Sequence, residues 1–448
     1  MTTVDSTKPR GPGRTRMLVG AGFGNFIEWY DFAAYGFVAV FIGKAFFPNA
    51  SEAAQLLSSF AVFGVSFFVR PLGGVFFGPL CDRVGRKRVL VLVLSIMAVT
   101  TFCIGILPSY ARIGILAPIL LVLLRCIQGF SAGGEFGTNT TFIAEHASPK
   151  RRGLSASLVP ASATLGVLVG GVVVFALESF LGSTAMQDWG WRIPFLIAGP
   201  LGLIGLYIRL ALEDTPAFKA LEASSEVESK PLVAVLAYKR GLSITAAVTV
   251  LYGVSYYFLM TYMATFLSKV VGFSSTTALL AVLLGGAVAL VVLPIAGALS
   301  DRYGRKAVLV TSAVAHILLA VPIFMLLGTG SLAAAILGTA LMAVIMAPFV
   351  AVSVALMAEL FPDSVRATGV SLGFNLPIAI FGGMAPFIAT FLINRTGINF
   401  MPSIYLVAVS VVALIGVLFL RPADLHGVTA PPKAPSETKP EPSAPVGS

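Results

Sequence analysis

Charged side chains are scarce in this sequence. Asp, Glu, Lys and Arg make up only 11% of the 448 residues, whereas hydrophobic residues make up 57%. Soluble domains contain about 25% charged and about 45–50% apolar residues, and the mean hydropathy of +0.92 departs from them in the same direction. The composition therefore excludes an ordinary soluble domain and indicates a protein that crosses the membrane many times.

Cysteine is also scarce. Cys81, Cys103 and Cys126 lie in or at the end of apolar stretches, and their spacing matches neither a disulfide framework nor a metal site. The sequence also shows no nucleophile–base pair, no cluster of metal ligands and no phosphate-binding loop. We therefore expect no enzymatic activity, no bound metal and no organic cofactor.

Long apolar stretches dominate the chain. A membrane-spanning helix needs roughly 20 apolar residues, and twelve stretches meet this length. The sequence predicts an all-α polytopic membrane protein with twelve transmembrane helices in two six-helix halves. We divide it into an N-terminal tail (1–16), a first half (17–212), a central loop (213–240), a second half (241–420) and a disordered, Pro/Ser-rich C-terminal tail (421–448).

Basic residues are concentrated in alternate connections between these stretches. Because cytoplasmic loops of membrane proteins are enriched in Lys and Arg, these connections and both termini are predicted to be cytoplasmic. The net charge of +10 then reflects topology, so we expect the partners to be the lipid bilayer and a small molecule rather than nucleic acid. The cytoplasmic connections include Arg83, Arg86, Lys87, Arg88, Lys150, Arg151, Arg152, Lys219, Lys230, Lys239, Arg240, Arg302, Arg305 and Lys306.

An internal repeat relates the two halves. "GPLCDRVGRK" (78–87) recurs as "GALSDRYGRK" (297–306), and "AEHASPKRRG" (144–153) is echoed by "AELFPDSVRATG" (358–369). Two similar halves that enclose a site near the middle of the membrane are typical of secondary transporters.

The repeated loops also predict a gate. A carboxylate at a helix end can bind the N-terminus of another helix or pair with an arginine, and such contacts would hold the cytoplasmic side closed. A generic basic loop is the alternative, but the repetition favours the gate. The predicted gate residues are Gly78, Asp82, Arg83, Gly85, Arg86, Glu145, Gly297, Asp301, Arg302, Arg305 and Glu359.

These motifs resemble a known family. The G-x-x-x-D-R-x-G-R-K loop is similar to the signature of the major facilitator superfamily, and "RCIQGFSAGG" (125–134) resembles its proton-coupling motif in the fourth helix. "EWYDF", "RPLGGVFFG" and "DWGWRIPF" look like the metabolite:proton symporter branch. "TFCIGILPSYARIGILAPILL", "PLGLIGLYIRLALEDTPAF" and "SYYFLMTYMATFL" resemble proline/betaine transporters. The resemblance covers about residues 20–420 and implies a monomer in a bacterial cytoplasmic membrane. The tail lacks the heptad-bearing segment of some proline/betaine transporters, so we do not expect osmosensing through such a segment.

The first half carries charges at membrane depth. Glu28 lies roughly 16 Å into the first predicted helix, near the middle of a core about 30 Å thick, and Asp31 shares its face one turn further out. Such groups must pair or face a wet cavity. The candidates for a proton-coupling network are Glu28, Asp31, Arg70, Arg125 and Glu135. A buried carboxyl group binds a proton more readily than an exposed one, and Asp31 is our first candidate because it lies nearer the outside. Static ion pairing is the alternative.

The second half offers aromatic and weakly polar side chains instead. A zwitterion suits this division, because an arginine binds its carboxylate and an aromatic face binds its ammonium group. We expect the substrate wall to include Trp29, Tyr30, Gln128, Tyr256, Tyr257 and Asn375; for Trp29 and Tyr30, simple packing is the alternative.

The predicted function is proton-coupled symport of a small zwitterionic osmolyte by alternating access, with the proton as the coupling ion. One alternative is symport of a carboxylate metabolite such as α-ketoglutarate, citrate or shikimate, which would require further cations in the second half. Another is drug/proton antiport, but the Gly/Pro pattern of antiporters is not evident in the fifth stretch.

Overall fold

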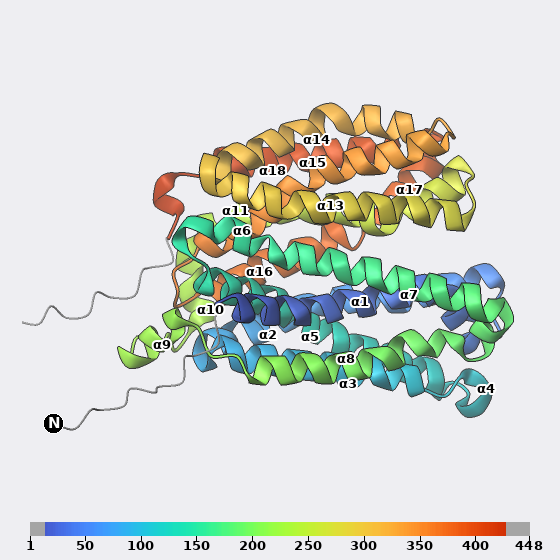
Figure 1. The fold of residues 1–448 in the computed structure, drawn as a ribbon, viewed down its shortest axis with the longest axis horizontal. Coiled ribbons are helices and arrows are strands. Elements are labelled where there is room, and N and C mark those ends of the chain that lie inside the picture. The colour runs from blue at the N-terminus through green and yellow to red at the C-terminus, as the bar shows by residue number, and fades with distance from the viewer. Residues whose placement is uncertain (1–13, 427–448) are drawn as a thin grey trace, which may run out of the picture.

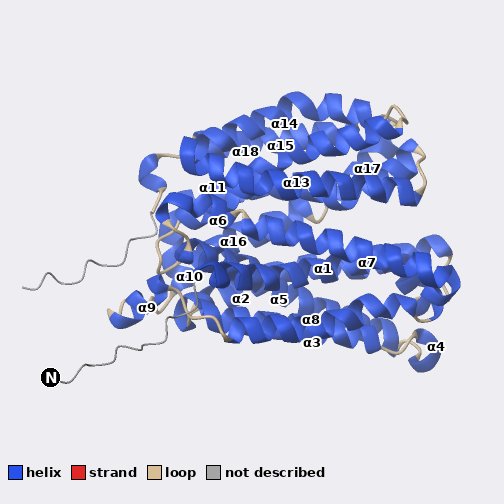
Figure 2. Ribbon diagram, viewed as in Figure 1, coloured by secondary structure: helices blue, strands red, loops and turns tan. Residues whose placement is uncertain are grey.

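The computed structural model describes residues 14–426, and within them the ordered elements are all helical (Figure 2). Twelve helices in this range are long and apolar enough to cross a membrane. The expectation of an all-α protein with twelve transmembrane helices is therefore confirmed.

The first six spans form one group of helices. The first of them begins at residue 14, three residues before the predicted start. A glycine with a φ of 99°, Gly85, separates the second span from the third, and this left-handed conformation favours a residue without a side chain. The helices are α1 (Arg14–Phe46), α2 (Glu52–Val84), α3 (Arg86–Ile106), α4 (Tyr110–Ile113), α5 (Leu116–His146), α6 (Arg152–Ala156), α7 (Leu158–Asp188) and α8 (Ile193–Leu210).

The second six spans form the other group. Gly304, with a φ of 87°, separates α13 from α14 as Gly85 separates α2 from α3. Three π-helical turns, 258–262, 266–271 and 378–382, interrupt the seventh and eleventh spans. The helices are α11 (Lys239–Tyr257), α12 (Met263–Thr265), α13 (Ser275–Tyr303), α14 (Arg305–Leu327), α15 (Leu332–Glu359), α16 (Arg366–Pro377), α17 (Ala385–Thr396) and α18 (Met401–Leu418).

The two groups pack against each other as two layers (Figure 1). Helix α16 of the second half contacts α2 and α5, and α13 contacts α6 and α7. The crossings use small residues: a Cβ atom on Gly78 would lie 3.0 Å from Thr368 Cα, and one on Gly297 would lie 2.5 Å from the carbonyl oxygen of Gly153. Glycine permits close helix contact at both crossings.

We call the end of the bundle where α2 meets α3 and α13 meets α14 the basic end, and the opposite end the far end. The basic end lies on the left of Figure 1 and includes the central loop, which contains two short helices, α9 (Pro216–Ala223) and α10 (Pro231–Ala234).

The prediction that the chain is disordered from residue 421 is wrong for residues 421–426. The backbone N–H of His426 donates to the carbonyl oxygen of Glu359 at 2.7 Å, and Arg240 Nε pairs with Asp424 at 2.9 Å. These contacts hold the segment on the basic end. Residues 1–13 and 427–448 of the predicted tails lie outside the described residues.

Candidate functional site

Two ion pairs join helices in the middle of the first half. Arg70 Nη2 of α2 lies 3.2 Å from Glu28 Oε1 of α1, and Arg125 Nη1 of α5 lies 3.2 Å from Asp31 Oδ2 of α1. All four side chains are at most 2% exposed. The pairing predicted for these residues is present, and each carboxylate has its own arginine.

Glu135 has a partner that the sequence analysis missed. We expected it to join Arg70 and Arg125, but Arg209 of α8 binds it instead, with Nη1 3.0 Å from Oε2. A Cβ atom on Gly24 would lie 1.9 Å from Arg209 Nη2, so this glycine makes room for the guanidinium. The apolar residues on both sides of Arg209 held the signal: an arginine within such a stretch, even in the last turn of its helix, needs a buried acceptor.

Gln128 belongs to the Asp31 pair. Its Nε2 donates to Asp31 Oδ2 at 3.1 Å and to Thr101 Oγ1 at 2.8 Å, and its Oε1 accepts from Arg125 Nη1 at 2.9 Å. The Arg125 guanidinium also lies 3.6 Å from the centre of the Tyr35 ring. Gln128 therefore positions the ion pair, and its hydrogen bonds are used there rather than in a substrate wall.

Trp29, Phe67, Tyr256 and Tyr257 form an aromatic cluster between the halves. The Trp29 ring centre lies 5.1 Å from that of Tyr256 and 6.1 Å from that of Tyr257, and the Phe67 and Tyr257 centres are 5.5 Å apart. Tyr257 Oη has no hydrogen-bond partner among the described residues. Three of the six predicted substrate residues therefore meet at one place, between α1, α2 and α11.

Two other predicted substrate residues do not line this cluster. Tyr30 Oη donates to the carbonyl oxygen of Pro194 at 3.1 Å, so its side chain packs against α8 inside the first half. It faces away because its neighbour Trp29 points to the second half, and adjacent helical residues lie about 100° apart. Asn375 is buried against α2 and α5, where Arg70 Nε donates to its Oδ1 at 3.3 Å.

The basic end contains two groups of charges, which occupy related positions in the two halves. Asp82, Arg86, Glu145, Thr215 and Arg366 form the first group, which we call the Arg86 cluster. Asp301, Arg305 and Glu359 form the second group, which we call the Arg305 cluster. Both arginines bind their glutamate through two nitrogens: Arg86 to Glu145 at 3.0 and 3.1 Å, and Arg305 to Glu359 at 3.0 and 3.3 Å.

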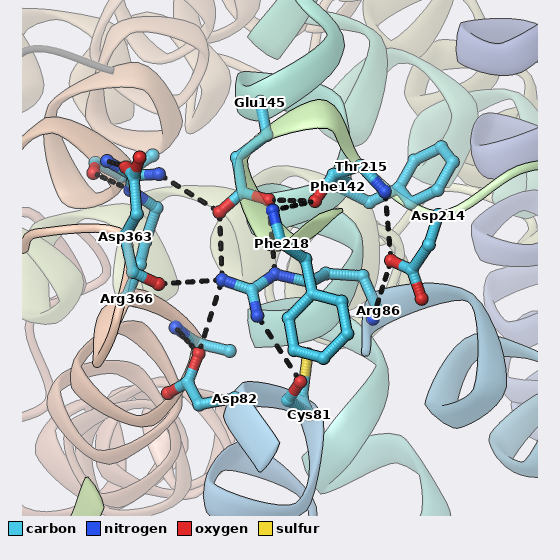
Figure 3. A network of polar contacts seen from close by, with 12 residues as sticks. Cys81, Asp82, Arg86, Phe142, Glu145, Asp214, Thr215, Phe218, Asp363 and Arg366 are labelled. Atoms are coloured by element: carbon cyan, nitrogen blue, oxygen red, sulfur yellow. Dashed lines mark hydrogen bonds and ion pairs between the residues drawn. The ribbon is translucent and has the colours of Figure 1, made fainter. Parts of the chain in front are cut away.

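The Arg86 cluster crosses from one half to the other (Figure 3). Asp82 accepts hydrogen bonds from the backbone N–H groups of Ala367 and Thr368 at 3.2 and 2.9 Å, at the N-terminus of α16. Arg366 Nη1 donates to Glu145 Oε1 at 3.0 Å. A carboxylate is favourable at a helix N-terminus because the unpaired N–H groups there carry partial positive charge. These contacts hold α16 against α2 and α5.

The Arg305 cluster makes the matching contact in the other direction. Asp301 accepts from the backbone N–H groups of Gly153 and Leu154 at 2.8 and 3.0 Å, at the start of α6. The side chains of the Arg305 cluster are about 10% exposed, whereas those of Asp82, Arg86 and Glu145 are 0% exposed.

Two of the predicted gate arginines lie outside these clusters. Arg83 donates to the carbonyl oxygen of Ser229, and Arg302 stacks on the neighbouring Tyr303 ring at 5.3 Å. Each follows its aspartate directly in sequence, so a helix turns it to a different face.

The central loop supplies gate contacts that the sequence analysis did not predict. Asp214 Oδ1 accepts from the Arg86 N–H at 3.0 Å, Thr215 Oγ1 donates to Glu145, and the Phe218 ring centre lies 5.1 Å from the Arg86 guanidinium carbon. These contacts could not be predicted from the loop alone, because Arg86 and Glu145 lie 128 and 70 residues from their partners in the chain.

The described residues contain no group of three or more His, Cys, Asp or Glu side chains arranged to hold a metal ion. Glu28, Asp31 and Glu135 of the first half are instead each paired with one arginine.

Comparison with known proteins identifies the family. Residues 21–376 and 289–447 match the model of the Major Facilitator Superfamily. The chain belongs to this superfamily. The Arg86 and Arg305 clusters therefore contain residues of the repeated loop motif that resembles the signature of this superfamily.

Curated superfamily relatives are transporters. The glycine betaine/proline/ectoine/pipecolic acid transporter OusA of Dickeya dadantii is 38% identical, over 95% of this chain and 88% of that protein. The proline/betaine transporter of Escherichia coli is 37% identical over 96% of this chain and 87% of that protein, and the ectoine/proline transporter ProP of Corynebacterium glutamicum is 37% identical over 93% and 86%. The resemblance to proline/betaine transporters is confirmed, and the chain is a transporter homologue rather than an enzyme.

A solved superfamily structure has the same fold. The proton:xylose symporter XylE bound to 6-bromo-6-deoxy-D-glucose superimposes with a TM-score of 0.76, covering 91% of this chain and 94% of that chain at 16% identity. This likeness supports the major facilitator fold.

Proposed function

We propose that the protein is a proton-coupled symporter of a small zwitterionic osmolyte that works by alternating access. The observation that carries the proposal is the position of the buried Arg70–Glu28 pair next to the aromatic cluster. The names of the curated relatives, which include proline, betaine and ectoine, support this substrate class.

The two parts of the site match the two charges of a zwitterion. Phe67 and Arg70 are one turn apart on the same face of α2, and Arg70 is paired with Glu28, so this charge pair borders the aromatic cluster. An arginine binds a carboxylate through its planar fork, and aromatic rings bind quaternary or secondary ammonium groups. We assign the substrate carboxylate to Arg70 and its ammonium group to Trp29, Tyr256 and Tyr257.

The proton would act through the carboxylates of the first half. When a carboxylate takes up a proton, its arginine loses a charged partner: a proton on Glu28 would free Arg70 for the carboxylate of the substrate, and a proton on Asp31 would free Arg125. Asp31 is our first candidate because it lies one turn nearer the far end than Glu28, and Glu135 is the third. The coupling ion would thus be a proton and no other cofactor would be needed.

The Arg86 and Arg305 clusters would form the gate at the basic end. Each links a loop of one half to a helix N-terminus of the other, so both must open before the halves can separate there. The excess of Lys and Arg at this end supports a cytoplasmic position for it and for both termini. We propose that the protein works as a monomer in a bacterial cytoplasmic membrane.

Transport by the purified protein in proteoliposomes tests the function. Uptake of labelled proline, glycine betaine, ectoine, α-ketoglutarate and shikimate would be measured under an imposed pH gradient. We expect uptake of one or more of the zwitterions only. Uptake of a carboxylate metabolite alone would overturn the substrate class, and expulsion of a hydrophobic cation would indicate an antiporter.

The alternative function, symport of a carboxylate metabolite, has less support in the structure. A dicarboxylate would need a second cation beside the aromatic cluster. The buried arginines of the second half, Arg305 and Arg366, lie at the basic end and are already paired with Glu359 and Glu145.

A further inference from the structure

Asn375 of α16 enters the first half through a slot that glycines create. A Cβ atom on Gly74 of α2 would lie 2.5 Å from Asn375 Nδ2, and one on Gly133 of α5 would lie 2.1 Å from the carbonyl oxygen of Arg70. Any side chain at Gly74 would therefore displace the amide, and any side chain at Gly133 would separate α2 from α5.

The Asn375 amide is fully used inside this slot. Its Nδ2 donates to the carbonyl oxygen of Gly133 at 2.8 Å and to that of Ser371 at 2.9 Å. Its Oδ1 accepts from Arg70 Nε at 3.3 Å, while Arg70 Nη2 is bound to Glu28. Arg70 thus holds one partner in each half, and the amide is 1% exposed.

The adjacent residue strengthens the same contact. The Phe374 ring stacks on Phe136 of α5, with centres 3.5 Å apart and planes 9° from parallel. The helix ends two residues after Asn375, at Pro377, and a π-helical turn follows from Ile378. Phe374 and Asn375, in the last turn of α16, therefore both contact α5 of the first half.

We propose that Asn375 is a latch residue. By this we mean that it positions Arg70 only while the basic end is closed, so that the geometry of the Arg70–Glu28 pair depends on this closure. This inference rests on the proposed function, and it corrects our expectation that Asn375 binds substrate. When α16 moves away from α2, the amide leaves its slot and Arg70 loses its partner in the second half. The charge pair of the first half therefore differs between the closed and open states.

A native cysteine reports on this closure. Cys81 of α2 is 0% exposed and packs in a cluster with Ala367 of α16, so it is reached by a thiol reagent when these helices separate. Replacing Cys103 and Cys126 by serine leaves Cys81 as the single thiol. The rate of Cys81 modification by N-ethylmaleimide would be measured in detergent without substrate.

We expect Asn375→Ala to raise this rate about tenfold, because the closed state loses hydrogen bonds that cross the interface. Gly74→Ala should raise it similarly, because its Cβ expels the amide. The double variant should react no faster than Asn375→Ala alone, since the Cβ atom at residue 74 acts only by displacing the Asn375 amide.

Gly64→Ala is the matched control on α2, because its Cβ would meet nothing within 4 Å.

Three outcomes would overturn the latch. One is an unchanged Cys81 rate in Asn375→Ala; a raised KM for substrate in the same variant would then make Asn375 a substrate ligand. Another is additive effects of the two substitutions. The last is a faster Cys81 modification that follows the fall in melting temperature from variant to variant, because general destabilisation would then explain it. Because the labelling needs no substrate, failure of the proposed transport function would not affect it.

Discussion

At the scale of single residues, the first half balances each buried carboxylate with an arginine. Glu28, Asp31 and Glu135 pair with Arg70, Arg125 and Arg209, which lie on α2, α5 and α8. An unpaired charge in this environment is costly, whereas a pair of opposite charges with its hydrogen bonds is tolerated. Removing one member of a pair therefore distinguishes a coupling role from a structural one.

Glu28→Gln and Asp31→Asn provide this test. If the residue carries the proton, its amide form should abolish uphill, proton-driven uptake but retain counterflow exchange of labelled for unlabelled substrate. Exchange survives because it does not require the carrier to release its proton. We expect this pattern for Asp31→Asn in proteoliposomes.

Melting temperature supplies the second readout for these variants. A purely structural pair would lose roughly 3–5 kcal/mol when one partner is removed, and every transport mode would fall together. A stable Asp31→Asn protein with intact uphill uptake would move the coupling role to Glu28 or Glu135.

Gly24 is a residue whose role depends entirely on a distant side chain. Gly24→Ala would place a Cβ atom 1.9 Å from Arg209 Nη2 and so displace the guanidinium from Glu135. We expect a loss of roughly 3–5 kcal/mol, because Glu135 would remain buried without its partner. Thermal unfolding of the purified variant would measure this loss.

Gly36→Ala is the control on the same helix, because a Cβ atom there meets nothing within 4 Å. It should unfold at or above the parent temperature, since alanine favours a helix. Equal melting temperatures for the two variants would contradict the assignment of Arg209 to Glu135.

At the scale of elements, two helix N-termini are each bound by an aspartate from the other half. The two contacts differ in burial and in number of bonds. Asp82 also accepts from Thr368 Oγ1 at 2.7 Å, in addition to the two backbone N–H groups and the Arg86 pair. The contact at α16 is therefore the stronger of the two.

Asp82→Asn should reduce transport severely, whereas Asp301→Asn should be milder. The amide has one acceptor oxygen, and its NH₂ group would face N–H donors at the start of α16. Each charged hydrogen bond that is lost is worth about 1.5–3 kcal/mol, and Asp301, being about 9% exposed, is partly compensated by water. Initial uptake rates, normalised to protein in the membrane, would measure the difference.

The control is protein amount and melting temperature for both variants. Normal uptake by a well-expressed Asp82→Asn protein would contradict a gate at the Arg86 cluster. A larger defect in Asp301→Asn would show that α6, rather than α16, limits opening.

At the scale of the whole molecule, the halves differ in composition but share one interface. The first half contributes the three buried charge pairs, and the second contributes tyrosines and the amide of Asn375. A proton bound in the first half can affect the substrate only if both meet at this interface. Proton-dependent uptake should therefore require both halves of the transporter.

We expect accumulation to rise with an inward proton gradient and to collapse when a protonophore is added. The physical reason is that the buried charges form neutral pairs, so a bound proton adds the charge that the gradient drives. Substrate accumulation in proteoliposomes of fixed internal pH would measure it. Uptake that followed a sodium gradient with no pH difference would contradict proton coupling.

Much of this organisation is encoded locally, and for that reason the sequence alone determined it. Apolar length sets the twelve spans, basic residues mark one end of the bundle, and the repeat around Asp82 and Asp301 predicts two related halves. Glu28 and Asp31 were identifiable as candidates because a carboxylate within a span needs a partner. Each of these features is recognised within short stretches of the chain, and the repeat is recognised by comparing two such stretches.

Only the tertiary structure decided which groups meet. Arg209 lies 74 residues from Glu135, and Asn375 lies 305 residues from Arg70. The sequence shows that buried charges and amides need partners, but several arginines could satisfy each carboxylate. The choice is made by helix packing, which brings Gly24 against Arg209 and Gly74 against Asn375, and close packing of this kind depends on the whole bundle rather than on any one stretch.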